Sequence, residues 1–305
     1  MRKVPELSLR QYKSGDHAAR AAFSRALSEG LRDYGFVVLI DHEVSRDLLD
    51  AAYALAAAIF AQPDAVKRRY AGGLRGYTPP GVEHAKDNPI PDLKEFWQIG
   101  HETNAADSAF WAPNVWPEHP AAFRATFQAL FAVLNETGCL LLEALAPTLD
   151  LEPGHFEPLV RHGDSVLRVL HYPPIDSRAD PNAVRSAAHE DINLLTILVA
   201  ATGAGLELLD RDNTWLPIVT DSNALIVDSG DMMARLTNNV IPATTHRVVN
   251  AAAHASRYSM PFFMHPTPDT SLAALPSCIG AGAKHPPITA GAFLNERLEA
   301  IGLKG

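Results

Sequence analysis

Two histidines and one carboxylate stand where they could share a metal ion. His189 and Asp191 lie two positions apart in a segment that ends in an apolar, β-branched run, which is typical of a buried strand entered through polar residues. Side chains of an extended segment alternate between its faces, so His189 and Asp191 point one way and Glu190 the other. His246, which opens a second short strand-like segment, is the candidate third ligand. Two imidazoles and a carboxylate form the facial triad that leaves open positions on a non-haem Fe(II).

A second pair of residues offers an anion-binding site. Arg257 and Ser259 follow His246 in another β-like segment and share one face of it. A guanidinium fork and a hydroxyl suit a carboxylate ligand, because both can donate hydrogen bonds to its oxygens. The spacing therefore predicts a metal centre and an anion clamp in the same half of the chain.

This ordered set of motifs resembles the isopenicillin-N-synthase-like family of Fe(II)/2-oxoglutarate-dependent oxygenases. A lone His-x-Asp would be weak evidence, but here it is followed in order by His246 and by the Arg-Tyr-Ser of residues 257–259. The similarity also covers shorter segments across nearly the whole chain, namely residues 35–38, 76–77, 92–97 and 167–174.

The resemblance implies a fold, a cosubstrate and a reaction. It implies a mixed α and β fold, with a double-stranded β-helix (jelly roll) core and flanking helices, one of them long and central. It also implies that His189, Asp191 and His246 bind Fe(II). Arg257 and Ser259, with Tyr172 near them, would hold the distal carboxylate of 2-oxoglutarate. Oxidation of a small organic substrate by O₂, most commonly hydroxylation, would release succinate and CO₂, with no catalytic side chain beyond the metal centre.

Composition narrows the range of partners. The 305 residues are 47% hydrophobic, which is ample for a packed core, and the net charge is -9. This acidic balance, without Lys/Arg runs, argues against nucleic acid and anionic membranes as partners and favours a small molecule. The two cysteines, Cys139 and Cys278, are too few for a disulfide framework. We therefore expect a cytoplasmic monomer without a signal peptide or membrane span.

We expect one domain over residues 1–305. Its parts are a helical and loop region over 1–120, a β-rich region over 160–270 that the resemblance implies is the jelly-roll core, and a C-terminal helix over 286–305. Helical spacing of apolar residues predicts further helices over 17–34, 45–61 and 120–149. Short β-patterned segments separated by turn residues predict strands at 36–40, 166–172, 194–199, 206–209, 215–219, 224–228, 246–250 and 258–264.

The substrate-binding residues are less well specified by the sequence. Residues 71–91 are rich in Gly and Pro, and so long a loop in a compact domain is either functional or a connector, so a lid is one interpretation. The residues we would test for contact with the substrate come from this loop, from the segment after it and from the predicted strand over 258–264: Arg75, Tyr77, Phe96, Gln98 and Phe263.

Three alternatives remain open at this point: an iron oxidase, a zinc-dependent hydrolase and a catalytically silent binding module, against which the intact set of metal ligands argues. An iron oxidase of the same fold could draw its electrons from its substrate rather than from 2-oxoglutarate. A zinc-dependent hydrolase would also use His and carboxylate ligands, although the sequence has no His-x-His or His-Glu-x-x-His cluster.

Overall fold

The computed structural model describes residues 4–85, 90–102, 112–176, 180, 182–199, 201–210, 212–219 and 223–303. Their strands form an eight-stranded sheet in the order β1-β2-β10-β7-β12-β5-β4-β3 and a four-stranded sheet in the order β6-β11-β8-β9. The strands are β1 Glu6–Ser8, β2 Phe36–Ile40, β3 Gly76–Thr78, β4 Glu95–Ile99, β5 Val166–Tyr172, β6 Ser186–His189, β7 Leu195–Val199, β8 Leu206–Leu209, β9 Trp215–Pro217, β10 Leu225–Ser229, β11 His246–Val248 and β12 Arg257–Met264. All described pairings are antiparallel except that of β1 with β2.

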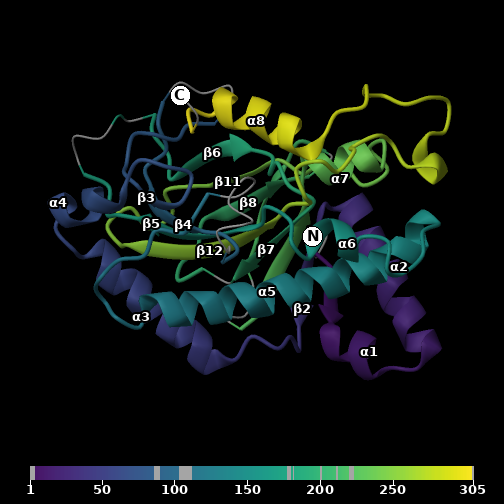
Figure 1. The fold of residues 1–305 in the computed structure, drawn as a ribbon, viewed down its shortest axis with the longest axis horizontal. Coiled ribbons are helices and arrows are strands. Elements are labelled where there is room, and N and C mark those ends of the chain that lie inside the picture. Colours follow the sequence, from purple (N-terminus) through teal and green to yellow (C-terminus); the bar gives the residue numbers. More distant parts are fainter. Residues whose placement is uncertain are drawn as a thin grey trace.

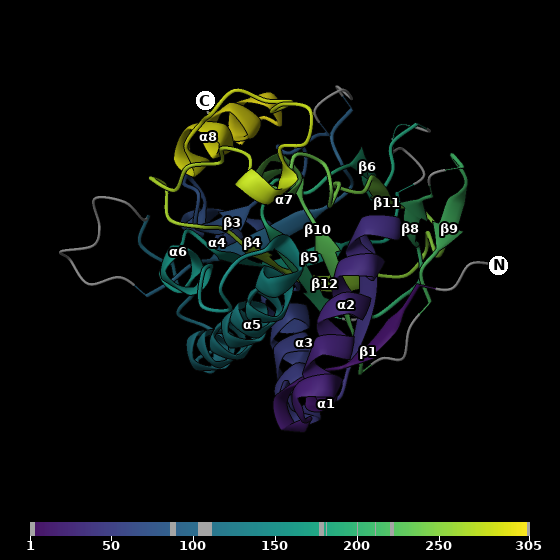
Figure 2. The same ribbon diagram turned by 90° about the vertical axis from the view of Figure 1, so that its right-hand side faces the viewer.

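Helices cover the outer face of the larger sheet. In Figures 1 and 2, α2, α3 and α5 lie along one side of it, while α7 and α8 lie on the opposite side. The α-helices are α1 Leu9–Ser14, α2 His17–Asp33, α3 Arg46–Phe60, α4 Asp64–Lys67, α5 Phe123–Leu145, α6 Glu157–Val160, α7 Asp231–Leu236 and α8 Ala290–Ala300. The 3₁₀ helices are η1 Arg68–Tyr70, η2 Ala146–Leu149 and η3 Pro276–Cys278.

The long helix α5 is the spine of the larger core. Phe127, Leu130, Leu134 and Leu141 have no exposed surface and belong to the same apolar cluster as Ile197 of β7. The span Phe123–Leu149 is long and apolar enough to cross a membrane by length and composition alone. Of its most apolar window, 67% is buried inside the protein, which is the behaviour of a core helix.

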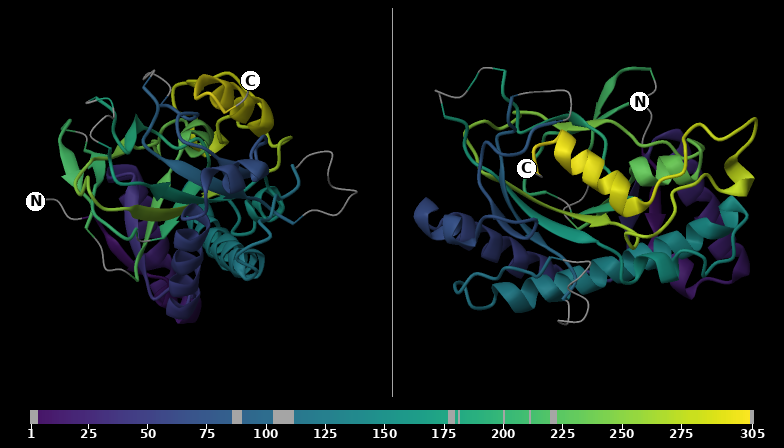
Figure 3. Two further views of the ribbon diagram at one scale, coloured as in Figure 1. Left: turned by 90° about the vertical axis from the view of Figure 1, so that its left-hand side faces the viewer. Right: turned by 45° about the horizontal axis from the view of Figure 1, so that its top comes forward.

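A smaller apolar cluster lies between the two sheets. Strand alternation explains it: Leu170 and Tyr172 of β5 belong to this inner cluster, whereas Leu167 and Val169 belong to the helix-covered core. The inner positions of the strands thus face the interior of the jelly roll. Figure 3 shows α8 on the far side of this interior from α5.

Local sequence signals account for several helix ends. Ser45 and Thr289 accept hydrogen bonds from the backbone N–H groups of Leu48 and Ala292, as expected of N-caps. Gly35 follows α2 with φ of +78°, and a Cβ there would overlap Thr244 Oγ1 at 1.4 Å. Only glycine therefore makes this turn into β2 without strain.

The predicted strands of the core are confirmed to within a few residues, and β5 and β8 have the predicted bounds. Four strands lie outside the predicted strand ranges, namely β1, β3, β4 and β6. β3 lies within the Gly- and Pro-rich loop and β4 in the segment after it, and they extend the larger sheet at one edge. The exact boundaries of the predicted regions at 120, 160, 270 and 286 stay predictions.

Candidate metal and 2-oxoglutarate site

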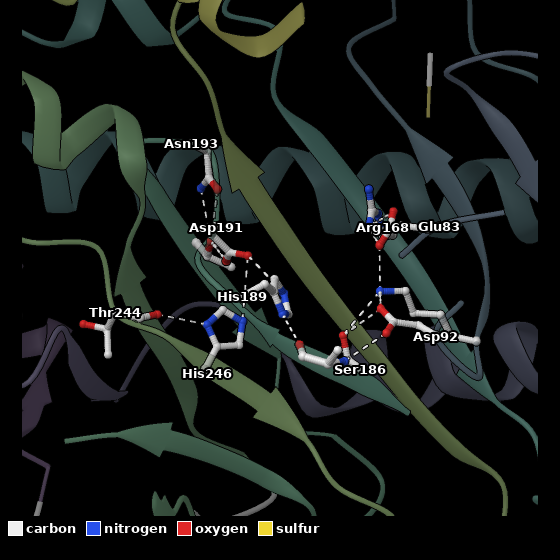
Figure 4. Close-up of polar contacts among 12 residues, drawn as sticks. Glu83, Asp92, Arg168, Ser186, His189, Asp191, Asn193, Thr244 and His246 are labelled. Carbon is white, nitrogen blue, oxygen red and sulfur yellow. Dashed lines mark hydrogen bonds and ion pairs between the residues drawn. The ribbon is translucent and has the colours of Figure 1, made fainter. Parts of the chain in front are cut away.

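The three predicted metal ligands converge. β6 and β11 are antiparallel neighbours in which His246 lies directly opposite His189, and Asp191 follows β6 by two residues. The Nε2 atoms of both histidines are 3.8 Å from Asp191 Oδ1, and one ligand atom from each residue lies within 4.8 Å of the others. Figure 4 shows the two rings and the carboxylate turned toward one another. This spacing suits a single divalent cation with further positions open.

Backbone carbonyls orient both imidazoles. His189 Nδ1 lies 2.7 Å from the Ala187 carbonyl oxygen, and His246 Nδ1 lies 3.3 Å from that of Thr244. A carbonyl can only accept, so each Nδ1 carries the proton and donates. The Nε2 lone pairs are therefore left for the metal, which is the usual arrangement around ligating histidines.

Polar neighbours orient the carboxylate in the same way. Thr196 donates its hydroxyl proton to Asp191 Oδ2, and the Asn193 amide donates to Thr196 Oγ1 at 3.1 Å. These bonds hold Oδ2, which leaves Oδ1 directed at the two imidazoles (Figure 4).

Electrostatics keep His189 and Asp191 in their metal-binding protonation states. Burial and the neighbouring His246 together lower the pKa of His189 to about 4. Burial by itself would raise the pKa of Asp191, but His246 and His189 outweigh it and hold that pKa below its usual value. These two residues therefore offer a neutral imidazole and an ionised carboxylate, the forms that bind a cation.

The predicted anion clamp lies on the adjacent strands β5 and β12. Arg257 is opposite Tyr172 in this pairing, with its guanidinium carbon 5.1 Å from the centre of the Tyr172 ring. Arg257 is 2% exposed and Ser259 3%. Arg257 Nε donates to the Gly203 carbonyl at 3.1 Å, whereas buried Nη1 has no hydrogen-bond partner among the described residues. A buried guanidinium nitrogen without an acceptor fits the distal carboxylate of 2-oxoglutarate.

A cavity of about 750 Å³ extends from the triad to α8. Arg75, Gln98 and Phe263, three of the five residues predicted to contact the substrate, line it. Tyr77 and Phe96 are not part of its lining. Tyr77 is buried and donates its hydroxyl proton to Glu95, on the side of β4 away from Gln98, and the Phe96 ring packs beneath Arg168 at 4.3 Å.

The loop predicted as a lid or connector forms part of the cavity wall. Leu74, Arg75 and residues 83–85 line the cavity. Residues 86–89 lie outside the described part of the chain. The lid interpretation stays a prediction.

Sequence reasoning missed a buried charged network beside the triad. Lys94 Nζ lies 2.6 Å from Glu83 Oε1 and 2.8 Å from Asp92 Oδ2, and Arg168 Nη1 lies 2.9 Å from Glu83 Oε2 (Figure 4). Burial would raise the pKa of Glu83, but Arg168 and Lys94 lower it to about 2. The available signal was an arginine inside the apolar run 166–172, at a position whose side chain must face the jelly-roll interior.

Family models match both halves of the chain. Residues 4–119 match the N-terminal region of non-haem dioxygenases of the morphine-synthesis type, and residues 163–266 match the 2OG-Fe(II) oxygenase superfamily. The 2-oxoglutarate-Fe(II) type oxidoreductase hxnY of Emericella nidulans is 32% identical over 303 residues, covering 93% of this chain and 86% of the relative.

Solved structures agree with these matches. A 2OG-Fe(II) oxygenase family protein from Caulobacter crescentus has a TM-score of 0.87 at 41% identity, covering 98% of this chain and 99% of that one. A Neurospora crassa protein solved in complex with α-ketoglutarate and thymine has a TM-score of 0.88 at 26% identity, covering 97% of this chain and 96% of that one.

The chain belongs to the 2OG-Fe(II) oxygenase superfamily. It is an Fe(II)- and 2-oxoglutarate-dependent dioxygenase with a jelly-roll core, as the motifs predicted. The findings favour this assignment over a zinc hydrolase or an oxidase that does not use 2-oxoglutarate.

Proposed function

We propose that this dioxygenase hydroxylates a small organic molecule bound in the cavity between the triad and α8. The observation that carries the proposal is the adjacency of the cavity to the metal ligands: His189 and Asp191 both line it. A molecule in the cavity therefore lies beside residues that would hold the metal. The volume of about 750 Å³ is typical of small-molecule sites.

The residues of the chain have separate roles in this reaction. His189, Asp191 and His246 would hold Fe(II), which supplies the O₂-dependent oxidising chemistry when 2-oxoglutarate is bound. Arg257 and Ser259 orient the cosubstrate through its distal carboxylate, with Tyr172 against the guanidinium.

Substrate-stimulated turnover tests the proposal. Protein loaded anaerobically with Fe(II) and 2-oxoglutarate is mixed with O₂ and a panel of small molecules, and succinate and hydroxylated product are measured. We expect a substrate to raise succinate release and to yield product in a 1:1 ratio with it. If every compound that stimulates succinate release does so without forming an oxidised product, the proposed hydroxylation is contradicted.

We also propose that the enzyme works as a cytoplasmic monomer and does not act on nucleic acid or membranes. In support, the net charge is -9, and both cysteines are buried and free, as suits a reducing compartment. Light scattering of the purified protein tests the monomer, and a dimer at micromolar concentration would refute it.

A further inference from the structure

The charged side chains that line the cavity are paired with one another. Lys94 lies between Glu83 and Asp92, and Glu83 also takes the guanidinium of Arg168. Across the cavity, two more pairs repeat this arrangement: Arg75 Nη2 lies 2.7 Å from Asp164 Oδ1, and Arg297 Nη2 lies 2.8 Å from Asp231 Oδ2. The four cations are thus matched by four carboxylates.

Besides the metal ligand Asp191, Glu190 is the exception among the described residues of the lining. It is exposed, and its Oε1 accepts a hydrogen bond from Thr245 Oγ1 at 2.7 Å. Because it is in contact with solvent, water screens its charge. It therefore does not make the interior of the cavity a cation site.

The hydrogen-bonding capacity of Lys94 and Arg168 is also largely used, whereas Arg75 Nε and Arg297 Nε have no partner among the described residues. The third contact of Lys94 Nζ is Ser186 Oγ at 3.3 Å. Arg168 donates through Nε and Nη2 to Gln98 Oε1 at 3.3 and 3.1 Å, in addition to its two bonds to Glu83. A charged ligand would have to break one of these pairs or remain without a counter-ion, and both outcomes cost several kcal/mol for a buried charge.

The rest of the lining is apolar or polar without charge. The Phe263 ring is half-buried against Arg168 at 5.2 Å, and Ile192, Leu294 and Leu298 supply further apolar surface. Asn295 on α8 and His265 at the end of β12 add neutral polar groups.

We propose that the cavity takes a molecule without net charge, partly apolar, with amide- or hydroxyl-type groups that hydrogen-bond to its walls. This inference rests on the proposed function, because it assumes that the cavity beside the triad is the substrate site.

Three matched probes test it: benzamide, benzoate and benzylammonium, which share a ring and differ in charge. The protein is loaded anaerobically with Mn(II) and 2-oxoglutarate, and the paramagnetic relaxation of the probe protons is measured by NMR, with Zn(II) as the diamagnetic control. We expect benzamide to be relaxed about tenfold more strongly than either charged probe, because they lose on the order of 1.4 kcal/mol or more of binding free energy. Equal or stronger relaxation of a charged probe, or none of benzamide, overturns the proposal.

The methylene protons of 2-oxoglutarate separate the two possible failures. If they are relaxed by Mn(II) and benzamide is not, the inference about charge is wrong and the cosubstrate site stands. If they are not relaxed, the site assignment on which the proposed function depends is wrong.

A charge-changing variant adds a second test. Glu83→Gln removes one carboxylate and leaves Lys94 and Arg168 with a surplus positive charge, so this variant should gain relaxation of benzoate over wild type. Glu190→Gln makes the same charge change at the exposed position and should not gain it. If the Glu83→Gln protein has the circular dichroism spectrum of wild type but does not gain benzoate binding, the proposal is overturned.

A separate observation concerns a second buried arginine. Arg185, which precedes β6, is 1% exposed, and no described carboxylate pairs with it. Its Nη2 donates to the carbonyl oxygens of Ala252, at 3.0 Å, and Ala255, whereas buried Nε has no partner among the described residues. A buried charge without a counter-ion costs several kcal/mol.

Arg185 lies close enough to Arg257 for their charges to interact. Burial lowers the pKa of Arg185, and the positive charge of Arg257 lowers it further. Each of the two guanidinium groups has one buried nitrogen without an acceptor, Arg185 Nε and Arg257 Nη1. Arg185 Nη2 donates to the Ala255 carbonyl, two residues before Arg257 in the chain, so both groups lie in one part of the interior. An anion within reach of both would supply the acceptors that they lack.

We infer that Arg185 is a second binding residue for the distal carboxylate of 2-oxoglutarate, acting beside Arg257. It also ties the strand that carries His189 to the loop before Arg257, since its backbone N–H donates to Asn250 Oδ1 at 3.1 Å. The metal ligands and the anion clamp are thereby fixed relative to each other.

The test compares 2-oxoglutarate with 2-oxopentanoate, which has the same chain without the distal carboxylate. Calorimetry on the anaerobic Mn(II)-loaded protein gives the Kd of each. Arg185→Met should weaken 2-oxoglutarate about tenfold or more, as expected for a lost charge-assisted interaction, and leave the Kd of 2-oxopentanoate unchanged.

Arg185→Lys should recover part of the loss, because it keeps the charge. Arg247→Met, at a half-exposed arginine paired with Glu207, is the matched control and should change neither Kd. Equal weakening of both ligands by Arg185→Met would show a purely structural role and overturn the inference, as would an unchanged Kd for 2-oxoglutarate.

Discussion

At the scale of single residues, the site depends on a few hydrogen bonds that decide which atom faces the metal. The protons on His189 Nδ1 and His246 Nδ1 go to backbone carbonyls, and the Thr196 hydroxyl holds one oxygen of Asp191. The remaining lone pairs are brought together with little freedom to turn away. Iron affinity therefore resides in these three side chains rather than in the general polarity of the site.

Removal of one ligand should abolish iron binding without unfolding the protein. We expect His189→Ala or Asp191→Ala to reduce bound iron to background, because two ligands do not hold Fe(II) against water, while the circular dichroism spectrum stays that of wild type. The measurement is iron content after desalting. Glu190→Gln is the control, because its side chain bonds to Thr245 and not to the triad; a wild-type iron content in His189→Ala would contradict the assignment.

The guanidinium fork of Arg257 should be more important than its charge. Arg257→Lys keeps the charge but loses the planar donor pair, so the KM for 2-oxoglutarate should rise roughly 10- to 100-fold, corresponding to about 1.5–3 kcal/mol for hydrogen bonds to a charged group. Initial rates of succinate release at varied 2-oxoglutarate check this. A KM within twofold of wild type would show that Arg257 does not hold the cosubstrate.

The sequence predicted the triad and the clamp because their residues lie in short segments with strand periodicity. His189 and Asp191 are separated by one residue, as are Arg257 and Ser259, so a local rule of alternation places each pair on one face. The network of Glu83, Lys94 and Arg168 has no such local signature. Glu83 lies in a loop, Lys94 directly precedes β4, and Arg168 lies in β5. They meet only because β4 and β5 are neighbours in the folded sheet.

At the scale of elements, α8 closes the cavity on the side away from α5. Gly291, Leu294, Leu298 and Ile301 line the cavity at helical spacing, whereas Phe293 is buried on another face of the helix. The sequence predicted this helix but not its role, because apolar residues on both faces conceal which face borders a ligand. β3 and β4 were missed for a related reason: Gly and Pro nearby, and Gln98 at an inward position, obscure the β pattern.

Loss of the α8 cap should loosen the cavity wall locally. Thr289→Ala removes the acceptor for the Ala292 N–H, which typically costs about 1 kcal/mol. Because that free energy corresponds to a factor of about five in a local opening equilibrium, amide hydrogens of the first turn of α8 should exchange about fivefold faster. Hydrogen exchange with mass spectrometry measures this. Thr289→Ser keeps a hydroxyl and should exchange like wild type, and faster exchange spread evenly over all helices of Thr289→Ala would contradict a local effect.

At the scale of the whole molecule, buried ionisable groups couple stability to pH. Burial lowers the pKa of His265 to about 4, and it does the same to His101, where His162 adds to the effect. A folded-state pKa below the unfolded value of about 6.5 means that the unfolded chain binds more protons below that pH. Stability is therefore full above pH 6.5 and falls as the pH drops toward 4.

His265→Asn isolates one part of this acid sensitivity. Asparagine stays neutral at every pH used and keeps an N–H near the Phe263 carbonyl, which His265 Nδ1 approaches at 3.3 Å. Between pH 6.5 and 4, wild type should lose on the order of 3 kcal/mol more unfolding free energy than the variant, since each unit of pKa shift corresponds to about 1.4 kcal/mol. Urea unfolding at half-unit pH steps, with both proteins metal-free, gives the two curves. If they run parallel over this range, His265 does not carry a burial-depressed pKa, and the acid sensitivity must come from the other buried histidines and from the carboxylate network around Glu83.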